Sequence, residues 1–409
     1  MNIVNPPNTP TSLTSSKTSS LDTTIKNENT QLPNTPIPPI PPIPEQQESP
    51  LTQSQEKKTI KIKLVNQGTY GCIYTPEISC DTGEPGDIRY VSKIQKNKET
   101  IQNEIVIGEL VKKINNYSFF FSIIESVCPV SISKINREEQ EKCKLISKDK
   151  TNNSLTNSKY ISGKIRYVSK MNIENYFLSL PREPDLLSKK LYASFFYVLK
   201  SLQKLYEQGI IHYDIKEKNV MYDEHNHSPI IIDFGLSFVP SLATTTELQN
   251  NAFYVDLFYP YWRFDIFVLS YITCFVRRKP ADANVTQEQI DELVNNFMKQ
   301  FIKFNQTNSI LLTEIETNTM KTNYTAMLTT YIGNTWEKVF EDFFKPEFYS
   351  TWDLYSTAIT FLIICKTIKV TEFENPTITK MIELWKSVLT AIPNQCKSME
   401  TILQEIQSL

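Results

Sequence analysis

The sequence predicts an α+β protein in two parts: a small antiparallel β part that carries one helix, followed by a larger, mainly helical part. Three observations favour this division. Before residue 170, apolar and polar residues alternate at strand spacing in several short runs, with a single helical pattern among them. A long helical pattern begins at residue 186. Most of 260–409 then also shows helical periodicity.

The first 57 residues are predicted to be disordered. They contain no Phe, Tyr or Trp and are rich in Asn, Thr, Ser and Pro, so they cannot bury enough apolar surface to offset chain entropy. Their run PIPPIPPIP favours a polyproline II conformation, which is typical of spacers and of ligands for proline-recognition domains; both remain open. The predicted divisions are a tail, a β part and a helical part, at 1–57, 58–170 and 171–409.

The β part is predicted from local alternation. Its helix covers about 99–114, where apolar residues recur on one face, and the polar stretch 136–158 is predicted to be an exposed excursion between two strands. The predicted strands are 59–66, 71–75, 88–94, 127–133 and 160–170.

The helical part begins with a predicted helix over 186–208, which Gly209 ends as a cap residue. Two short apolar stretches follow. His225 and His227 lie between them, and we expect a turn there rather than a zinc site, because no Cys or acidic pattern completes one.

Composition excludes several classes of protein. A net charge of −2 gives no general attraction to nucleic acid or to an anionic membrane surface. The longest apolar runs are nearer to ten residues than to the ~20 of a membrane span, and the N-terminus shows no secretion signal. The seven cysteines are scattered, which predicts reduced thiols in a cytosol-like compartment and a cytoplasmic location.

The run IIHYDIKEKNVMYD at 210–223 places many polar residues between two apolar stretches. Asp214 and Asn219 lie in its predicted loop. The next apolar run, PIIIDFGLS, ends in Asp233. Carboxylate and amide oxygens suit Mg²⁺, which leaves room for phosphate oxygens. A second carboxylate, here Asp214, can accept the proton of an attacking hydroxyl.

The β part supplies groups that bind phosphate. VNQGTYGCIY places Gly68 and Gly71 in a strand–turn–strand, where a bare backbone can approach a phosphate. Lys93 ends YVSK on the third predicted strand. An inward lysine needs a carboxylate to fix it, and the following helix offers Glu104 or Glu109.

In this order and at these spacings, GTYGCIY, YVSK, HYDIKEKN and IDFG resemble the signature motifs of eukaryotic-type protein kinases. The resemblance covers about 58–275. The low-complexity tail and the Asn/Lys/Ile-rich composition resemble the kinases of large DNA viruses. The resemblance implies a two-lobed, protein-kinase-like fold, with the β part as nucleotide-binding lobe. It also implies phosphoryl transfer from ATP, with Mg²⁺ or Mn²⁺, to serine or threonine of a protein substrate, in the cytoplasm of a cell or host, or in a virion.

The resemblance also implies residue roles. Asp214 is the expected catalytic base, Lys216 a contact to the γ-phosphate, Asn219 and Asp233 the Mg²⁺ ligands, and Lys93 the contact to the α/β-phosphates. The serine/threonine preference rests on Lys216.

The nucleotide site has further expected members. Glu104 is favoured as the partner of Lys93, with Glu109 as the alternative, and the purine is expected near 167–171. The residues expected to cover the phosphates are Asn66, Gln67, Gly68, Thr69, Tyr70, Gly71, Cys72 and Ile73. Cys72 is interpreted as a small apolar filler among them.

Three departures from the family pattern stand out. Asn66 replaces the first glycine of the phosphate loop, although Asn tolerates unusual backbone angles. Tyr213 replaces the arginine that receives an activating phosphate, which argues against such activation through Thr244–Thr246. No Ala-Pro-Glu follows, and FYPYW at 258–262 is its candidate replacement.

Two points stay open. The helix that anchors the catalytic loop begins either at Asp265 or at Asp353, and Asp265 is favoured because its distance from Asp233 is nearly the expected one. The function also has alternatives. The departures favour a pseudokinase scaffold, and the same fold serves small-molecule kinases, although Lys216 and the complete Asp-Phe-Gly argue against the latter.

Overall fold

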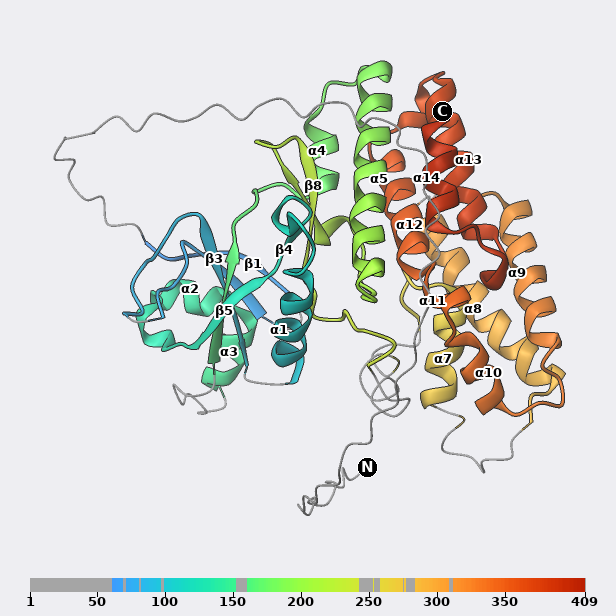
Figure 1. Ribbon diagram of the computed structural model, residues 1–409, viewed down its shortest axis with the longest axis horizontal. Coiled ribbons are helices and arrows are strands. Elements are labelled where there is room, and N and C mark those ends of the chain that lie inside the picture. Colours follow the sequence, from blue (N-terminus) through green and yellow to red (C-terminus); the bar gives the residue numbers. More distant parts are fainter. Residues whose placement is uncertain are drawn as a thin grey trace, which may run out of the picture. The chain divides into compact units, whose positions relative to one another are not determined.

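The fold follows from a computed structural model, which describes residues 61–68, 71–80, 82–96, 99–151, 160–242, 253, 258–274, 276, 284–308 and 312–408. The predicted disordered tail and its proline run lie outside the described residues. So do Thr69, Tyr70 and Thr244–Thr246. The predicted α+β class is confirmed: an antiparallel sheet with one long helix precedes a mainly helical remainder (Figure 1).

The N-terminal sheet has five strands in the order β1-β2-β3-β6-β5, and every neighbouring pair is antiparallel. Each predicted strand has a counterpart here, because alternation at a period of two is a local signal. In the middle strand, Lys93 is paired with Ile73 on one side and Gly163 on the other. The strands are β1 (Lys63–Gln67), β2 (Gly71–Thr75), β3 (Tyr90–Lys96), β5 (Ile124–Pro129) and β6 (Tyr160–Arg166).

Helix α1 (Glu99–Val111) packs against β5 and ends three residues before the predicted boundary at 114. Ile107 and Val111 lie on its buried face in the large hydrophobic core, which also holds Phe121. That face carries Glu104 inward, so burial of the apolar stripe fixes the direction in which this carboxylate points.

The stretch 136–158 lies between β5 and β6, as predicted, and most of its described residues are exposed, but it is folded onto the sheet. Two short helices, α2 (Arg137–Lys142) and α3 (Lys144–Thr151), lie there. Cys143 and Ile146, three residues apart, are fully buried in a second apolar cluster with Tyr74 of β2. Such a sparse apolar pattern needs the sheet as a partner, and this is why composition alone indicated an exposed stretch.

The prediction of reduced thiols is wrong for four of the cysteines. Cys72 forms a disulfide with Cys143, and Cys80 forms one with Cys128. Cys72 is therefore a half-cystine that ties β2 to the α2–α3 junction, not an apolar filler. The partners are 71 and 48 residues apart in the chain, so no short spacing indicated them. Cys274, Cys365 and Cys396 form no disulfide.

The second part begins with α4 (Ile173–Ser179) and α5 (Pro184–Glu207). Gly209 follows with φ of 71°, a left-handed conformation that suits glycine at a helix end. A three-stranded sheet comes next in the order β4-β8-β7, from β4 (Phe121–Ser122), β7 (Val220–Asp223) and β8 (Ser228–Ile232). His225 and His227 lie in the turn between β7 and β8, as predicted.

Helices make up most of the remaining chain, and α5 packs against α12, α13 and α14 (Figure 1). Among the described residues, none of the helices combines the length and apolar character that crossing a membrane requires. The helices are α7 (Phe264–Cys274), α8 (Gln287–Asn308), α9 (Glu314–Thr329), α10 (Trp336–Phe343), α11 (Pro346–Tyr349), α12 (Trp352–Thr367), α13 (Pro376–Thr390) and α14 (Met399–Gln407).

Candidate active site

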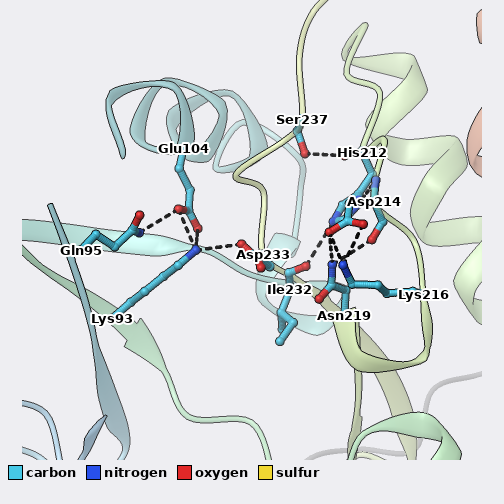
Figure 2. A network of polar contacts seen from close by, with 10 residues as sticks. All are labelled: Lys93, Gln95, Glu104, His212, Asp214, Lys216, Asn219, Ile232, Asp233 and Ser237. Carbon is cyan, nitrogen blue, oxygen red and sulfur yellow. Dashed lines mark hydrogen bonds and ion pairs between the residues drawn. The ribbon is translucent and has the colours of Figure 1, made fainter. Parts of the chain in front are cut away.

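Lys93 on β3 and Glu104 on α1 form a buried ion pair. The lysine Nζ lies 2.9 Å from each carboxylate oxygen (Figure 2). Gln95 donates a further hydrogen bond to Glu104 at 3.2 Å. The alternative partner, Glu109, pairs with Lys112 on the same helix. The structure thus places Glu104, and not Glu109, at the lysine.

Lys93 also reaches Asp233, whose Oδ1 lies 2.8 Å from the same Nζ (Figure 2). Burial opposes the charge of Lys93, but attraction to Asp233 and Glu104 outweighs it and raises the lysine pKa. Burial likewise raises the pKa of Asp233, and the nearby Lys93 ammonium more than reverses this, so the net shift is downward. Both groups are therefore charged at neutral pH.

Asp214 lies in the loop between α5 and β7. Its carboxylate accepts hydrogen bonds from Lys216 Nζ at 2.9 and 2.7 Å and from Asn219 Nδ2 at 2.8 Å (Figure 2). The Asn219 amide also donates to the backbone oxygen of Asp214 at 2.8 Å, which closes the loop upon itself. The structure therefore brings these three side chains together, as the resemblance to protein kinases implies.

Asp353, at the start of α12, anchors this loop. Its carboxylate accepts hydrogen bonds from the backbone N–H groups of His212 and Tyr213, both at 2.8 Å. The preference for Asp265 is wrong: that buried carboxylate pairs with Arg263 and accepts a bond from Trp352 Nε1 at 2.6 Å. Both aspartates open an apolar helix, so the local pattern did not separate them. The expected number of residues between Asp233 and the anchoring helix favoured Asp265, but in this chain α7–α11 lie between Asp233 and α12 in the sequence.

The Asp-Phe-Gly stretch follows β8 directly. Asp233 has φ of 65°, a left-handed conformation that is uncommon for a residue other than glycine. The next residue, Phe234, is buried with its ring 5.0 Å from that of His212 and 6.0 Å from that of Phe121. His212 Nε2 lies 3.1 Å from the Ile232 oxygen, so this histidine packs the loop against the end of β8.

The phosphate loop joins β1 and β2. Asn66 Oδ1 accepts a hydrogen bond from the Gln67 N–H at 2.8 Å, and Gly68 N–H donates to Gly71 O at 2.9 Å. A Cβ on Gly71 would lie 2.5 Å from the Ile94 oxygen, whereas a Cβ on Gly68 would meet nothing within 4 Å. Close packing therefore requires glycine at 71, and leaves 68 open to a ligand.

Asn219 and Asp233 have the donor chemistry of a magnesium site. Asn219 uses Nδ2 for its hydrogen bonds, so its Oδ1, the atom that would bind a metal, accepts none from a described residue. A carboxylate and an amide oxygen match the one or two protein ligands that Mg²⁺ usually takes. No group of three or more His, Cys, Asp and Glu side chains within the described part of the chain is arranged to hold a metal ion.

Sequence reasoning missed three side chains that contact the catalytic loop. Tyr259, Tyr261 and Trp262 donate hydrogen bonds to Asp214, Glu217 and the Tyr213 oxygen, respectively. The sequence signal that could have indicated these contacts is the cluster of aromatic residues with polar atoms in FYPYW, the candidate replacement for Ala-Pro-Glu.

Comparison with known proteins agrees with this geometry. Residues 138–257 match the family described as "Protein kinase domain", a span that includes Asp214, Asn219 and Asp233. The fold is protein-kinase-like. The expected resemblance to the eukaryotic-type protein kinase superfamily is thereby confirmed.

This kinase-like chain is also similar to "Probable serine/threonine-protein kinase fnkB" of Dictyostelium discoideum, with 38% identity over 74 residues. The match covers 18% of this chain and only 13% of that protein. A solved structure, "Structure of the Cydia pomonella Granulovirus kinase, PK-1", matches with 16% identity and a TM-score of 0.30, over 44% of this chain and 54% of that one. A TM-score this low does not support the expected similarity to kinases of large DNA viruses.

Proposed function

We propose that the protein transfers the γ-phosphoryl group of ATP to serine or threonine hydroxyls of protein substrates. One observation carries the proposal. Lys93 on the sheet bonds both to Glu104 on α1 and to Asp233 after β8, and thereby ties the phosphate-binding lysine to a candidate metal ligand (Figure 2). The chemistry needs a cation for phosphate and a carboxylate for a divalent metal within reach of one nucleotide.

In this mechanism Lys93 holds the α/β-phosphates and Lys216 contacts the γ-phosphate. Asp214 orients the acceptor hydroxyl and accepts its proton as the new oxygen–phosphorus bond forms and the β–γ bond breaks. Asn219 and Asp233 would hold Mg²⁺ or Mn²⁺, and the ion would supply positive charge that neutralises the phosphates. Catalysis comes from positioning and from fixed charges, because phosphoryl transfer requires little covalent chemistry of the protein.

The remaining assignments extend this proposal. Residues 66–73 cover the phosphates, and the purine lies against 167–171, which follow β6 and precede α4. The nucleotide lobe covers 58–170 and the catalytic lobe 171–409. The partner is a protein substrate. The two disulfides remove the argument from reduced thiols, so the cytoplasm of a cell or host stands as a proposed location beside a virion. Both a spacer and a proline-recognition ligand remain open for the tail.

A pseudokinase scaffold is the second candidate. Two departures from the family pattern favour it: Asn66 in the expected phosphate loop and Tyr213 beside the proposed base. A small-molecule kinase is the third candidate, against which stand Lys216 and the complete Asp-Phe-Gly.

The test is transfer of labelled phosphate from γ-labelled ATP by the full chain, with Mg²⁺ or Mn²⁺, to basic and acidic generic proteins. We expect labelled phosphoserine or phosphothreonine, and a loss of about 100-fold or more in the Asp214→Asn variant. The matched control is Asp291→Asn, at an exposed position of α8, where the rate should not change.

Two results would contradict the proposal. Nucleotide binding without transfer would favour the scaffold. Transfer to small alcohols or aminoglycosides, but not to proteins, would favour the small-molecule kinase.

A further inference from the structure

The strongest unassigned feature is the segment FYPYW, residues 258–262, called here the aromatic strap. Three of its side chains donate hydrogen bonds to consecutive parts of the catalytic loop. The bonds are Tyr259 OH to Asp214 Oδ1 at 2.9 Å, Tyr261 OH to Glu217 Oε2 at 2.6 Å, and Trp262 Nε1 to the Tyr213 oxygen at 2.8 Å. The resemblance to protein kinases predicted none of these contacts.

The strap is itself held in place. The Trp262 N–H donates to the Tyr259 oxygen at 2.9 Å, which closes a turn. Ser356 on α12 donates to the Tyr261 oxygen at 2.7 Å, so the helix that anchors the catalytic loop also anchors the strap. The Trp262 ring stacks on Tyr213 with centroids 4.6 Å apart. No phosphate group is needed for any of these contacts.

Asp214 shows why Tyr259 differs from the other donors. An ionised carboxylate offers about four lone-pair sites, and here Lys216 takes two, Asn219 one and Tyr259 one. In the proposed mechanism Lys216 has a second partner in the γ-phosphate. When the lysine turns to that phosphate, a site on Asp214 becomes available to the acceptor hydroxyl.

Tyr259 has no such second partner in the proposed mechanism. Its hydroxyl stays with Oδ1 and keeps the carboxylate from rotating while Lys216 moves. Burial, followed by the charge of Asp214, raises the pKa of Tyr259. The phenol is therefore a protonated, neutral donor at neutral pH, and its hydrogen bond persists throughout the reaction.

We propose that Tyr259 is a positioning residue that fixes the orientation of the Asp214 carboxylate during phosphoryl transfer. This inference rests on the proposed function. In this proposal the aromatic strap orders the catalytic loop through direct contacts. This ordering does not depend on phosphorylation of the chain.

The test compares two matched substitutions in the full chain. Tyr259→Phe removes only the hydroxyl that reaches Asp214, whereas Tyr261→Phe removes the neighbouring hydroxyl that reaches Glu217. We expect kcat to fall about tenfold or more in Tyr259→Phe, with the KM for ATP within about twofold of wild type. In Tyr261→Phe, kcat should fall clearly less than in Tyr259→Phe, because Glu217 has no part in the proposed chemistry. If the strap had only a structural role, both substitutions would lower kcat to the same extent.

A second readout does not require activity. If the hydrogen bond is present, Tyr259→Phe should lower the melting temperature in the wild-type background and have little effect in an Asp214→Leu background. Equal losses in the two backgrounds would overturn the assignment, whether or not the chain transfers phosphate.

Four further results would also overturn it. An unchanged kcat in Tyr259→Phe would show that the hydroxyl has no positioning role. A higher kcat would show that it competes with the acceptor hydroxyl for Asp214. Phosphotyrosine at Tyr259 would make this residue a substrate. Absence of transfer by the wild-type chain, with the melting-temperature coupling intact, would instead locate the failure in the proposed function, and the positioning role would fall with it.

Discussion

The carboxylate of Asp353 accepts a hydrogen bond from the backbone N–H of Tyr213 at 2.8 Å. Tyr213 has φ of 69°, a left-handed conformation that costs of order 1–3 kcal/mol for a residue with a side chain. Such a conformation persists only where its surroundings hold it. Here Asp353 fixes the backbone while packing against Trp262 fixes the ring. The catalytic loop is therefore held by α12 and the aromatic strap together.

Replacement of Asp353 by Asn should loosen this loop. One of the two carboxylate acceptors becomes a donor that faces an N–H group, so we expect a loss of about 1–3 kcal/mol in the free energy of unfolding, measured by urea denaturation. Amide hydrogen exchange at His212 and Tyr213 should quicken.

Asp265→Asn is the comparison for this change. It disturbs the buried pair with Arg263 but leaves the two amides bonded to Asp353. If exchange at those amides quickened equally in both variants, Asp353 would not be the specific anchor.

The two glycines of the phosphate loop should respond differently to alanine. At Gly71 a Cβ would lie 2.5 Å from the Ile94 oxygen, so β2 and β3 must separate, and we expect a loss of about 1–3 kcal/mol of stability. At Gly68 an added Cβ would meet no atom within 4 Å, and the change should stay within about 0.5 kcal/mol. Denaturant unfolding measures both, and similar losses would refute the close approach at Gly71.

Loss of the Cys72–Cys143 disulfide should destabilise the β part. This bond joins residues 71 positions apart, and its removal by Cys143→Ser should cost about 2–4 kcal/mol, because the unfolded chain is no longer constrained. Thermal unfolding without reductant is the measurement. Cys396→Ser, at a cysteine without a disulfide, is the control and should change the melting temperature little. Identical curves for Cys143→Ser and wild type would mean that the bond does not form.

Glu316 should give part of the stability a pH dependence. Burial raises its pKa, but hydrogen bonds from Thr313 and Lys386 outweigh burial, so the net shift is downward. A carboxyl group with a lowered folded-state pKa stabilises the fold above its unfolded value of about 4.3, and this stability is lost as pH falls through the folded value. Glu316→Gln should therefore be less stable than wild type at pH 7, by about 0.5 kcal/mol.

The gap between wild type and Glu316→Gln should close in acid, which urea denaturation between pH 7 and pH 3 will show. Glu314→Gln is the control, since Glu314 forms no ion pair with any described residue. A gap that is the same at every pH would argue against a charged role for Glu316.

Local signals predicted much of the fold and of the site. Alternation predicted the strands, and the resemblance of HYDIKEKN to a protein-kinase motif implied that Asp214, Lys216 and Asn219 lie together. The failures concern contacts between distant segments. Asp265 and Asp353 open similar apolar helices, so only the folded chain shows which one reaches Tyr213. The Cys72–Cys143 disulfide and the strap contacts likewise depend on tertiary structure, which no local pattern encodes.

The origin of the anchor has a consequence for biosynthesis. Asp353 follows Tyr213 by 140 residues, because α7–α11 are inserted between the strap and α12. At about 5–20 residues per second, a ribosome needs roughly 7–28 s to cover that distance. During this interval the nascent chain carries its base and candidate metal ligands without the residue that holds their loop. The proposed active site therefore cannot assemble until α12 has been synthesised.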